Sequence, residues 1–143
     1  MAFGERRGVV GGARTMSGLV RRAAVRAARV AGFLVWFAGR LVQANLVVAR
    51  EIVTPGLGLQ PAVVRVPLRA RTDTEVALLT LFVTLTPGTL ALAVRRDPRV
   101  MWVHGMYAAD ATAFRRGVAE LEGRLLTAVR PVGGDRIGSE GGG

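Results

Sequence analysis

Cysteine and lysine are both absent from this sequence of 143 residues, and histidine occurs once, as His104. Without cysteine the chain has no disulfide, no thiolate metal ligand and no cysteine nucleophile. A single strand histidine with no neighbouring acid is a poor metal ligand, so we interpret His104 as a structural residue. The chain also lacks a glycine-rich phosphate loop with lysine. These absences predict a protein with no catalytic, metal-binding or cofactor-binding residues, and therefore not an enzyme.

Acidic residues are scarce as well. Ten acids stand against twenty arginines, which gives a formal net charge of +10, and half of the residues are apolar. The apolar content indicates contact with a membrane. The arginine excess indicates one of three roles: binding to nucleic acid, binding to an anionic membrane surface, or control of membrane topology.

Residues 1–29 are rich in glycine, alanine and arginine, and they contain one acid, Glu5. We expect a basic, disordered tail that keeps the N-terminus cytoplasmic. Residues 30–49 follow as about twenty mostly apolar residues, which is the length of one membrane span. We predict a membrane-associated helix that continues to residue 53 and so covers residues 30–53.

Two orientations of this helix remain open. At about 100° per residue, one narrow arc of the helical wheel holds both charged and apolar residues: Arg22, Arg26, Arg29, Arg40 and Glu51, with Phe33, Trp36 and Val47. An arginine at the centre of a span costs at least about 2.5 kcal/mol, so a lone lipid-facing span is the weakest choice. The helix therefore either lies in the membrane interface or spans with one face against a partner subunit. The residues expected to meet the membrane or a partner are Phe33, Trp36, Arg40, Gln43 and Asn45.

A proline–glycine pair predicts a linker over residues 54–61. Residues 62–68 then alternate apolar and polar side chains, as an edge strand does. Thr72 and Glu75 form a capping box that starts a helix near Asp73.

Residues 76–94 carry no charge and are long enough to span a membrane as a single helix. Inside a helix, Pro87 would cost about 3 kcal/mol, and Gly88 adds to that cost. Residues 89–94 also alternate as a strand should. We therefore predict a buried helix, a tight turn and a strand, with a second membrane span as the alternative.

The remaining sequence predicts a hairpin and a helix. Residues 95–99 form the hairpin connection, and residues 100–106 form a third strand. Asp110 caps an amphipathic helix over residues 111–129. The charged residues of that helix are expected to face outward: Arg115, Arg116, Glu120, Glu122 and Arg124.

The predicted fold class is α+β. An N-terminal membrane-associated helix precedes a small β-α-β-β-α domain over residues 62–130, and residues 131–143 form a glycine-rich disordered tail. The turn within the charge-free run is the main structural motif, and its threonine hydroxyls are expected to cap the helix end rather than to bind an ion. The motif residues are Thr84, Thr86, Pro87, Gly88, Thr89 and, on the third strand, His104.

These segments together resemble the MnhE/MrpE family, the E subunits of the Mrp/Mnh-type multisubunit cation/proton antiporters. The hallmark of that family is a TLTPGT segment followed by a strand that bears a Val-His pair. Residues 84–89 and 103–104 match both elements, and the resemblance covers about residues 31–129. Members of that family usually begin with a hydrophobic hairpin, whose place is taken here by the arginine-rich tail. Anchoring is then expected to fall on residues 30–53 and on partner subunits.

The resemblance implies a non-catalytic accessory subunit of a complex that exchanges Na⁺ for protons in the bacterial plasma membrane. Its partners would be the other antiporter subunits and the membrane, with no nucleic acid and no small-molecule substrate bound by this subunit alone. Its C-terminal domain would lie on the cytoplasmic side. The alternative is a basic, membrane-anchored module that binds anionic lipid or nucleic acid.

Overall fold

The structure is a computed structural model that describes residues 10–54, 56 and 60–131, with side chains from residue 16 onward. A long helix precedes a small domain of three strands and two helices, which confirms the α+β class. The elements are α1 (Val10–Val53), β1 (Ala62–Pro67), α2 (Asp73–Leu85), β2 (Thr89–Arg96), β3 (Arg99–Gly105) and α3 (Ala111–Val129).

Helix α1 begins much earlier than the sequence predicted. It starts at Val10, so the expectation of disorder is wrong for residues 10–29. Alanine and arginine are among the strongest helix formers, and between residues 21 and 29 they outweigh the glycines in the first turns of the helix. The rest of the predicted N-terminal tail, and the predicted tail beyond residue 131, lie outside the described residues.

The sheet has the order β1-β3-β2, and both pairs are antiparallel. The predicted hairpin between β2 and β3 is confirmed. Its turn is tighter than expected, because pairing continues to Arg96 and Arg99 and leaves only Asp97 and Pro98 between the strands. Val66 and Met101 are paired and buried, so this face of the sheet points into the core.

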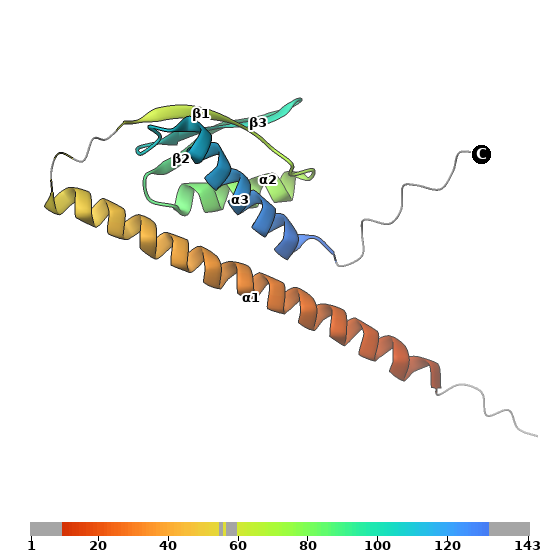
Figure 1. Ribbon diagram of the computed structural model, residues 1–143. Coiled ribbons are helices and arrows are strands. Elements are labelled where there is room, and N and C mark those ends of the chain that lie inside the picture. Colours follow the sequence, from red (N-terminus) through yellow and green to blue (C-terminus); the bar gives the residue numbers. More distant parts are fainter. Residues whose placement is uncertain (1–9, 55, 57–59, 132–143) are drawn as a thin grey trace, which may run out of the picture.

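Helices α2 and α3 cover one face of the sheet, and α1 passes beneath them on the side away from the sheet (Figure 1). The core between sheet and helices includes Leu79, Met101 and Leu125, all at most 2% exposed. Phe33 and Phe37 of α1 belong to the same hydrophobic cluster. The long helix is therefore packed against the domain rather than joined to it only by the linker.

The predicted caps fix the ends of the domain helices. Thr72 and Glu75 form the capping box of α2, and Asp110 accepts hydrogen bonds from the backbone at the start of α3. Helix α2 ends at Leu85, and β2 begins at Thr89. The charge-free run is therefore broken as predicted, and the alternative of a second membrane span is wrong.

Candidate subunit and membrane interface

Threonine hydroxyls close the corner between α2 and β2. The Thr86 hydroxyl donates to the carbonyl of Phe82 at 3.0 Å, and the Thr89 hydroxyl donates to the carbonyls of Val83 and Thr86. These bonds satisfy carbonyl groups that the end of a helix leaves without partners. Thr84 lies in the last turn of α2, and its side chain is exposed.

Gly88 makes the sharp change of direction at this corner. Its φ of 85° lies in the left-handed region that glycine adopts readily. A Cβ at this position would lie only 3.2 Å from the Tyr107 ring. The Gly88 carbonyl also accepts the N–H of Met106 at 2.8 Å, which ties the corner to the end of β3. The corner is thus held by backbone conformation, packing and hydrogen bonds at once.

An open cleft of about 480 Å³ lies between α1, this corner and α3. Arg40 and Gln43 line it from α1, and Thr86, Pro87 and Thr89 line it from the corner. The fold thus brings together five predicted residues from two separate parts of the sequence. The rest of the wall is mainly apolar and includes Phe37, Ala44, Val47, Val83, Phe114 and Leu121.

Aromatic side chains fasten α1 to the domain. Phe33 and Phe37 each meet the Phe82 ring edge-on, with centroids 4.9 and 4.8 Å away. Trp36 lies under the Arg124 guanidinium of α3, 4.4 Å from the ring centroid. Contacts of these kinds are worth about 0.5–1.5 kcal/mol each beyond area burial. Phe33 and Trp36 therefore contact this chain's own domain.

Two other predicted residues lie away from the cleft. Asn45 is exposed on α1, where its side-chain amide donates to the carbonyl of Leu41 at 2.8 Å. His104 follows the buried Val103 on β3, and successive strand residues point to opposite faces. His104 therefore lies on the sheet face away from α2 and α3.

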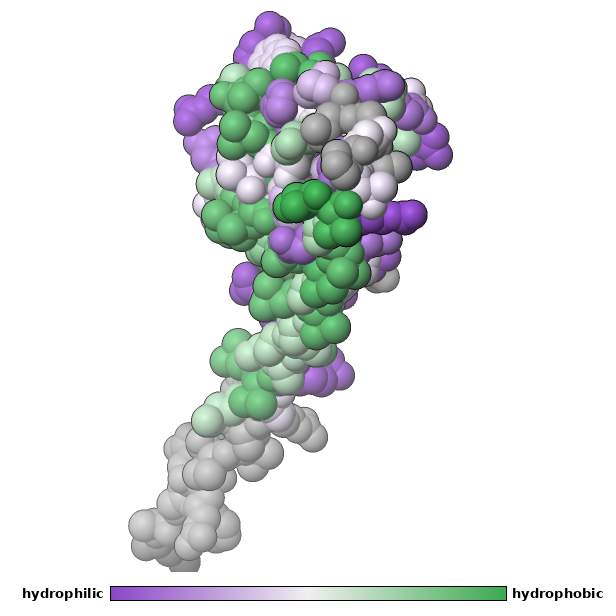
Figure 2. All heavy atoms as spheres, turned by 90° about the vertical axis from the view of Figure 1, so that its left-hand side faces the viewer, coloured by the Kyte–Doolittle hydropathy of each residue, from purple (hydrophilic) through white to green (hydrophobic). Residues whose placement is uncertain are grey.

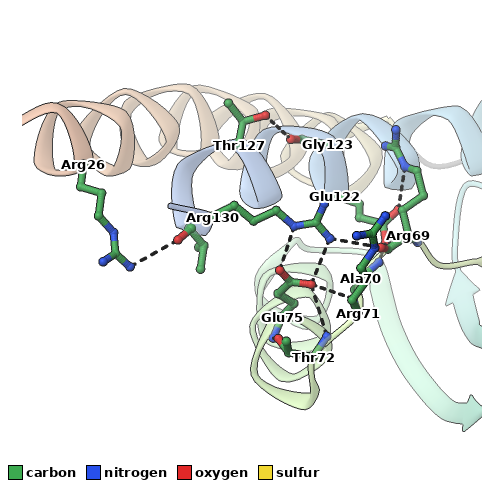
Figure 3. A network of polar contacts seen from close by, with 11 residues as sticks. Arg26, Arg69, Ala70, Arg71, Thr72, Glu75, Glu122, Gly123, Thr127 and Arg130 are labelled. Carbon is green, nitrogen blue, oxygen red and sulfur yellow. Dashed lines mark hydrogen bonds and ion pairs between the residues drawn. The ribbon is translucent and has the colours of Figure 1, made fainter. Parts of the chain in front are cut away.

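The buried carboxylate of Glu75 connects α2 to the end of α3. From the sequence, this residue was assigned only to the capping box. Glu75 accepts a hydrogen bond from Arg130 Nε at 2.9 Å and one from the backbone N–H of Arg71 at 2.7 Å (Figure 3). The Arg130 hydrogen bond, assisted by the backbone N–H groups of Arg71 and Thr72, lowers the pKa of Glu75 from 4.5 to about 2 against the opposing effect of burial.

A second buried carboxylate corrects the sequence analysis. Glu122 was expected to face outward but is 1% exposed. It accepts the backbone N–H groups of Arg69 and Ala70 at 2.6 and 2.9 Å, and Arg69 Nε at 3.3 Å (Figure 3). The connection after β1 folds over this side of α3, so a residue that looked solvent-facing satisfies two backbone donors. No sequence signal marks that contact.

Glu120 and Asp110 also make structural contacts. Glu120 pairs with Arg124 one turn later at 3.3 Å. The backbone N–H groups of Ala113 and Thr112 lower the pKa of Asp110, the N-cap of α3. Because these acids serve the fold, the features that remain for binding a partner are surfaces: the cleft and the uncovered side of α1.

The comparison with protein families identifies the chain. A model of the family described as "Na+/H+ ion antiporter subunit" matches residues 8–128. The chain belongs to this family. This match confirms the resemblance seen in the sequence, which covered about residues 31–129. It also extends further toward the N-terminus and includes the arginine-rich part of α1.

Similar proteins agree with this assignment. The chain is 34% identical over 93 residues to the E subunit of the Na(+)/H(+) antiporter of Alkalihalophilus pseudofirmus, covering 65% of this chain and 59% of that protein. It is 32% identical over 75 residues to the protein of the same name in Bacillus subtilis, covering 52% of this chain and 48% of that protein. The chain thus spans about half to three fifths of the length of these two relatives.

Solved structures show the same fold in membrane complexes. A chain of the Mrp complex from Dietzia sp. DQ12-45-1b is similar at a TM-score of 0.57 and 35% identity, over 71% of this chain and 96% of that chain. A chain of an archaeal membrane-bound sulfane sulfur reductase is similar at a TM-score of 0.50 and 25% identity, over 55% of this chain and 48% of that chain.

Proposed function

We propose that this chain is a non-catalytic accessory or assembly subunit of a multisubunit Na⁺/H⁺ antiporter in the bacterial plasma membrane. The observation that carries the proposal is that acidic side chains of the domain make structural hydrogen bonds. Glu75, Glu122 and Asp110 each hold helices or loops together. A proton path through a membrane needs ionisable groups in its apolar part. From residue 16 to its end, α1 carries a single acid, Glu51, in its last turn. Ion translocation would then fall to other subunits.

The partners we propose are the other antiporter subunits and the lipid membrane, with no nucleic acid and no small-molecule substrate bound by this subunit alone. We place the domain on the cytoplasmic side, because arginine-rich segments beside a membrane are retained there. The alternative of a basic module that binds nucleic acid is less favoured. From Arg14 onward, the arginines of the predicted tail belong to helix α1 and to the region that the family model matches.

The test is to delete the gene and measure Na⁺-dependent proton antiport in everted membrane vesicles, together with the amount of assembled complex. We expect both to be lost, and both to return when the wild-type chain is expressed. Unchanged antiport in vesicles that contain a fully assembled complex would contradict the proposal.

A second variant separates assembly from ion transport. Glu51→Gln removes the single acid that α1 carries from residue 16 to its end. If the subunit carries no ion, the pH profile of antiport and its apparent KM for Na⁺ stay those of the wild-type complex. A shifted pH profile with the complex intact would show that this subunit contributes to the ion path.

A further inference from the structure

Helix α1 has one long side that nothing in the described structure covers. We define its outer face by the exposed residues Val20, Leu34, Val35, Val42, Leu46 and Val53, which alternate with alanines. Val35 and Val53 are 75% and 82% exposed. At about 100° per residue, every charged residue of α1 from residue 16 onward falls outside this face. Figure 2 shows the hydrophobic side chains as a continuous band along the helix below the domain.

The length of this face decides how it can meet a membrane. The helix segment Met16–Val53 has 38 residues and contains a stretch that is long and apolar enough to cross a membrane. At 1.5 Å per residue it is about 57 Å long, whereas the hydrocarbon core of a bilayer is about 30 Å thick. A spanning helix would leave almost half of the outer face in water. A helix that lies in the membrane surface immerses all of it.

The domain also opposes a spanning orientation. Phe33 and Phe37, in the middle of the segment Met16–Val53, are covered by Phe82 of α2. Arg26 reaches the carbonyl of Val129 at the end of α3 at 3.4 Å (Figure 3). A span through this segment would pull α2, α3 and their charged side chains into hydrocarbon, at about 2.5 kcal/mol or more for each buried charge.

We propose that α1 lies flat in the membrane surface, with its outer face among the acyl chains and with Arg21 and Arg50 on the phosphates of anionic phospholipids. Both arginines flank the outer face on the helical wheel. The four ion pairs found among the described residues all lie in the domain, so none of them engages Arg21 or Arg50. Arginine can bury its stem along an apolar surface and keep its guanidinium at headgroup level. This inference deepens the proposed function and rests on its membrane location, but its test uses the chain alone and needs no antiport.

The first experiment measures immersion depth along the helix. Val20, Ala31, Val42 and Val53 are eleven residues apart and lie on one line, because eleven residues make about three turns. Each is replaced by cysteine in the full chain, labelled with a nitroxide, and bound to vesicles of phosphatidylglycerol and phosphatidylcholine. Collision with oxygen and with a water-soluble nickel complex reports the depth. We expect one similar depth of about 5–10 Å at all four positions.

The matched control is Val63→Cys on β1. Val63 is 55% exposed, close to the 59% of Val42, but it lies on the sheet, the layer farthest from α1 (Figure 1). Its label is expected to remain in water. A depth maximum at residues 31 and 42 with shallow ends would overturn the proposal in favour of a span. Labels on α1 that contact water, or that are shielded from both reagents by protein, would overturn it as well.

The second experiment tests the headgroup chemistry. Arg21→Gln together with Arg50→Gln is expected to weaken binding to the anionic vesicles roughly tenfold or more, since each arginine near an anionic surface contributes about 1 kcal/mol, or about fivefold in affinity. The control pair, Arg95→Gln with Arg99→Gln at the distal hairpin, has the same charge change and is expected to alter binding less than twofold. Equal losses in the two pairs, or equal wild-type binding to pure phosphatidylcholine, would contradict the proposed lipid contact.

Discussion

Glu75 is the residue whose ionisation matters most to the domain. Its folded pKa of about 2 lies below its ordinary 4.5, so its charged form stabilises the fold. That contribution is fully present above pH 4.5 and is lost as the pH falls toward 2. We predict that Glu75→Gln lowers the free energy of unfolding by about 1–3 kcal/mol at pH 7, because Arg130 and the backbone donors lose their anionic partner. Denaturant unfolding at pH 7, 4.5 and 3 measures this.

The control for this prediction is Glu120→Gln. Glu120 makes only a surface pair with Arg124, and such pairs contribute about 0–1 kcal/mol. The difference in the free energy of unfolding between wild type and Glu75→Gln should shrink as the pH falls below 4.5. The corresponding difference for Glu120→Gln should stay small at every pH. A gap between wild type and Glu75→Gln that is the same at pH 3 as at pH 7 would refute the role of this charge.

Gly88 carries a second prediction at this scale. Gly88→Ala is expected to destabilise the domain by about 1–2 kcal/mol, because a left-handed conformation disfavours a Cβ and the new atom meets Tyr107. The control is Gly39→Ala in α1, where the added Cβ has open space and should stabilise the helix by about 0.5–1 kcal/mol. Thermal unfolding compares the two.

The whole motif can be tested with Pro87→Ala combined with Gly88→Ala. We expect lost folding or lost assembly of the subunit, because the corner between α2 and β2 would lose both residues that set its direction. An antiporter complex that assembles normally but shows altered ion selectivity would argue for an ion site at the corner instead.

At the scale of elements, the contact between α1 and the domain depends on a few aromatic rings. Phe37 is 6% exposed, so Phe37→Ala is expected to lower the free energy of unfolding by about 3 kcal/mol. Val35→Ala, on the opposite side of the same helix, should change it by less than about 0.5 kcal/mol in solution. Limited proteolysis should then cleave α1 faster in Phe37→Ala only. Equal protection in the two variants would mean that α1 is held by other contacts.

The elements themselves were largely predictable. The capping box at Thr72, the break at Pro87 and the cap at Asp110 each act within a turn or two of sequence, so local chemistry locates the helices. The start of α1 was misplaced because the glycine-rich, basic composition of residues 1–29 favoured disorder, although the alanines and arginines of the same range are strong helix formers. The buried Glu122 was missed because its partners come from the connection after β1, far away in sequence.

For the whole molecule, the proposed orientation predicts which side of the membrane the domain faces. The chain has no native cysteine, so Val63→Cys and Thr112→Cys provide single labelling sites on β1 and α3. A membrane-impermeant maleimide is expected to label both in everted vesicles and neither in intact cells. Labelling of either site in intact cells would place the domain outside and contradict the cytoplasmic assignment.

The sequence by itself determined the order of the elements, the corner at residues 84–89 and the family, because capping, proline geometry and a short motif act over a few neighbouring residues. Only the tertiary structure decided which sides of α1 are occupied. It covers Phe33 and Trp36 with the domain, joins Arg40 and Gln43 to the corner across one cleft, and leaves the opposite side bare. Helical periodicity shows which residues share a face, whereas only packing between distant segments decides what that face meets.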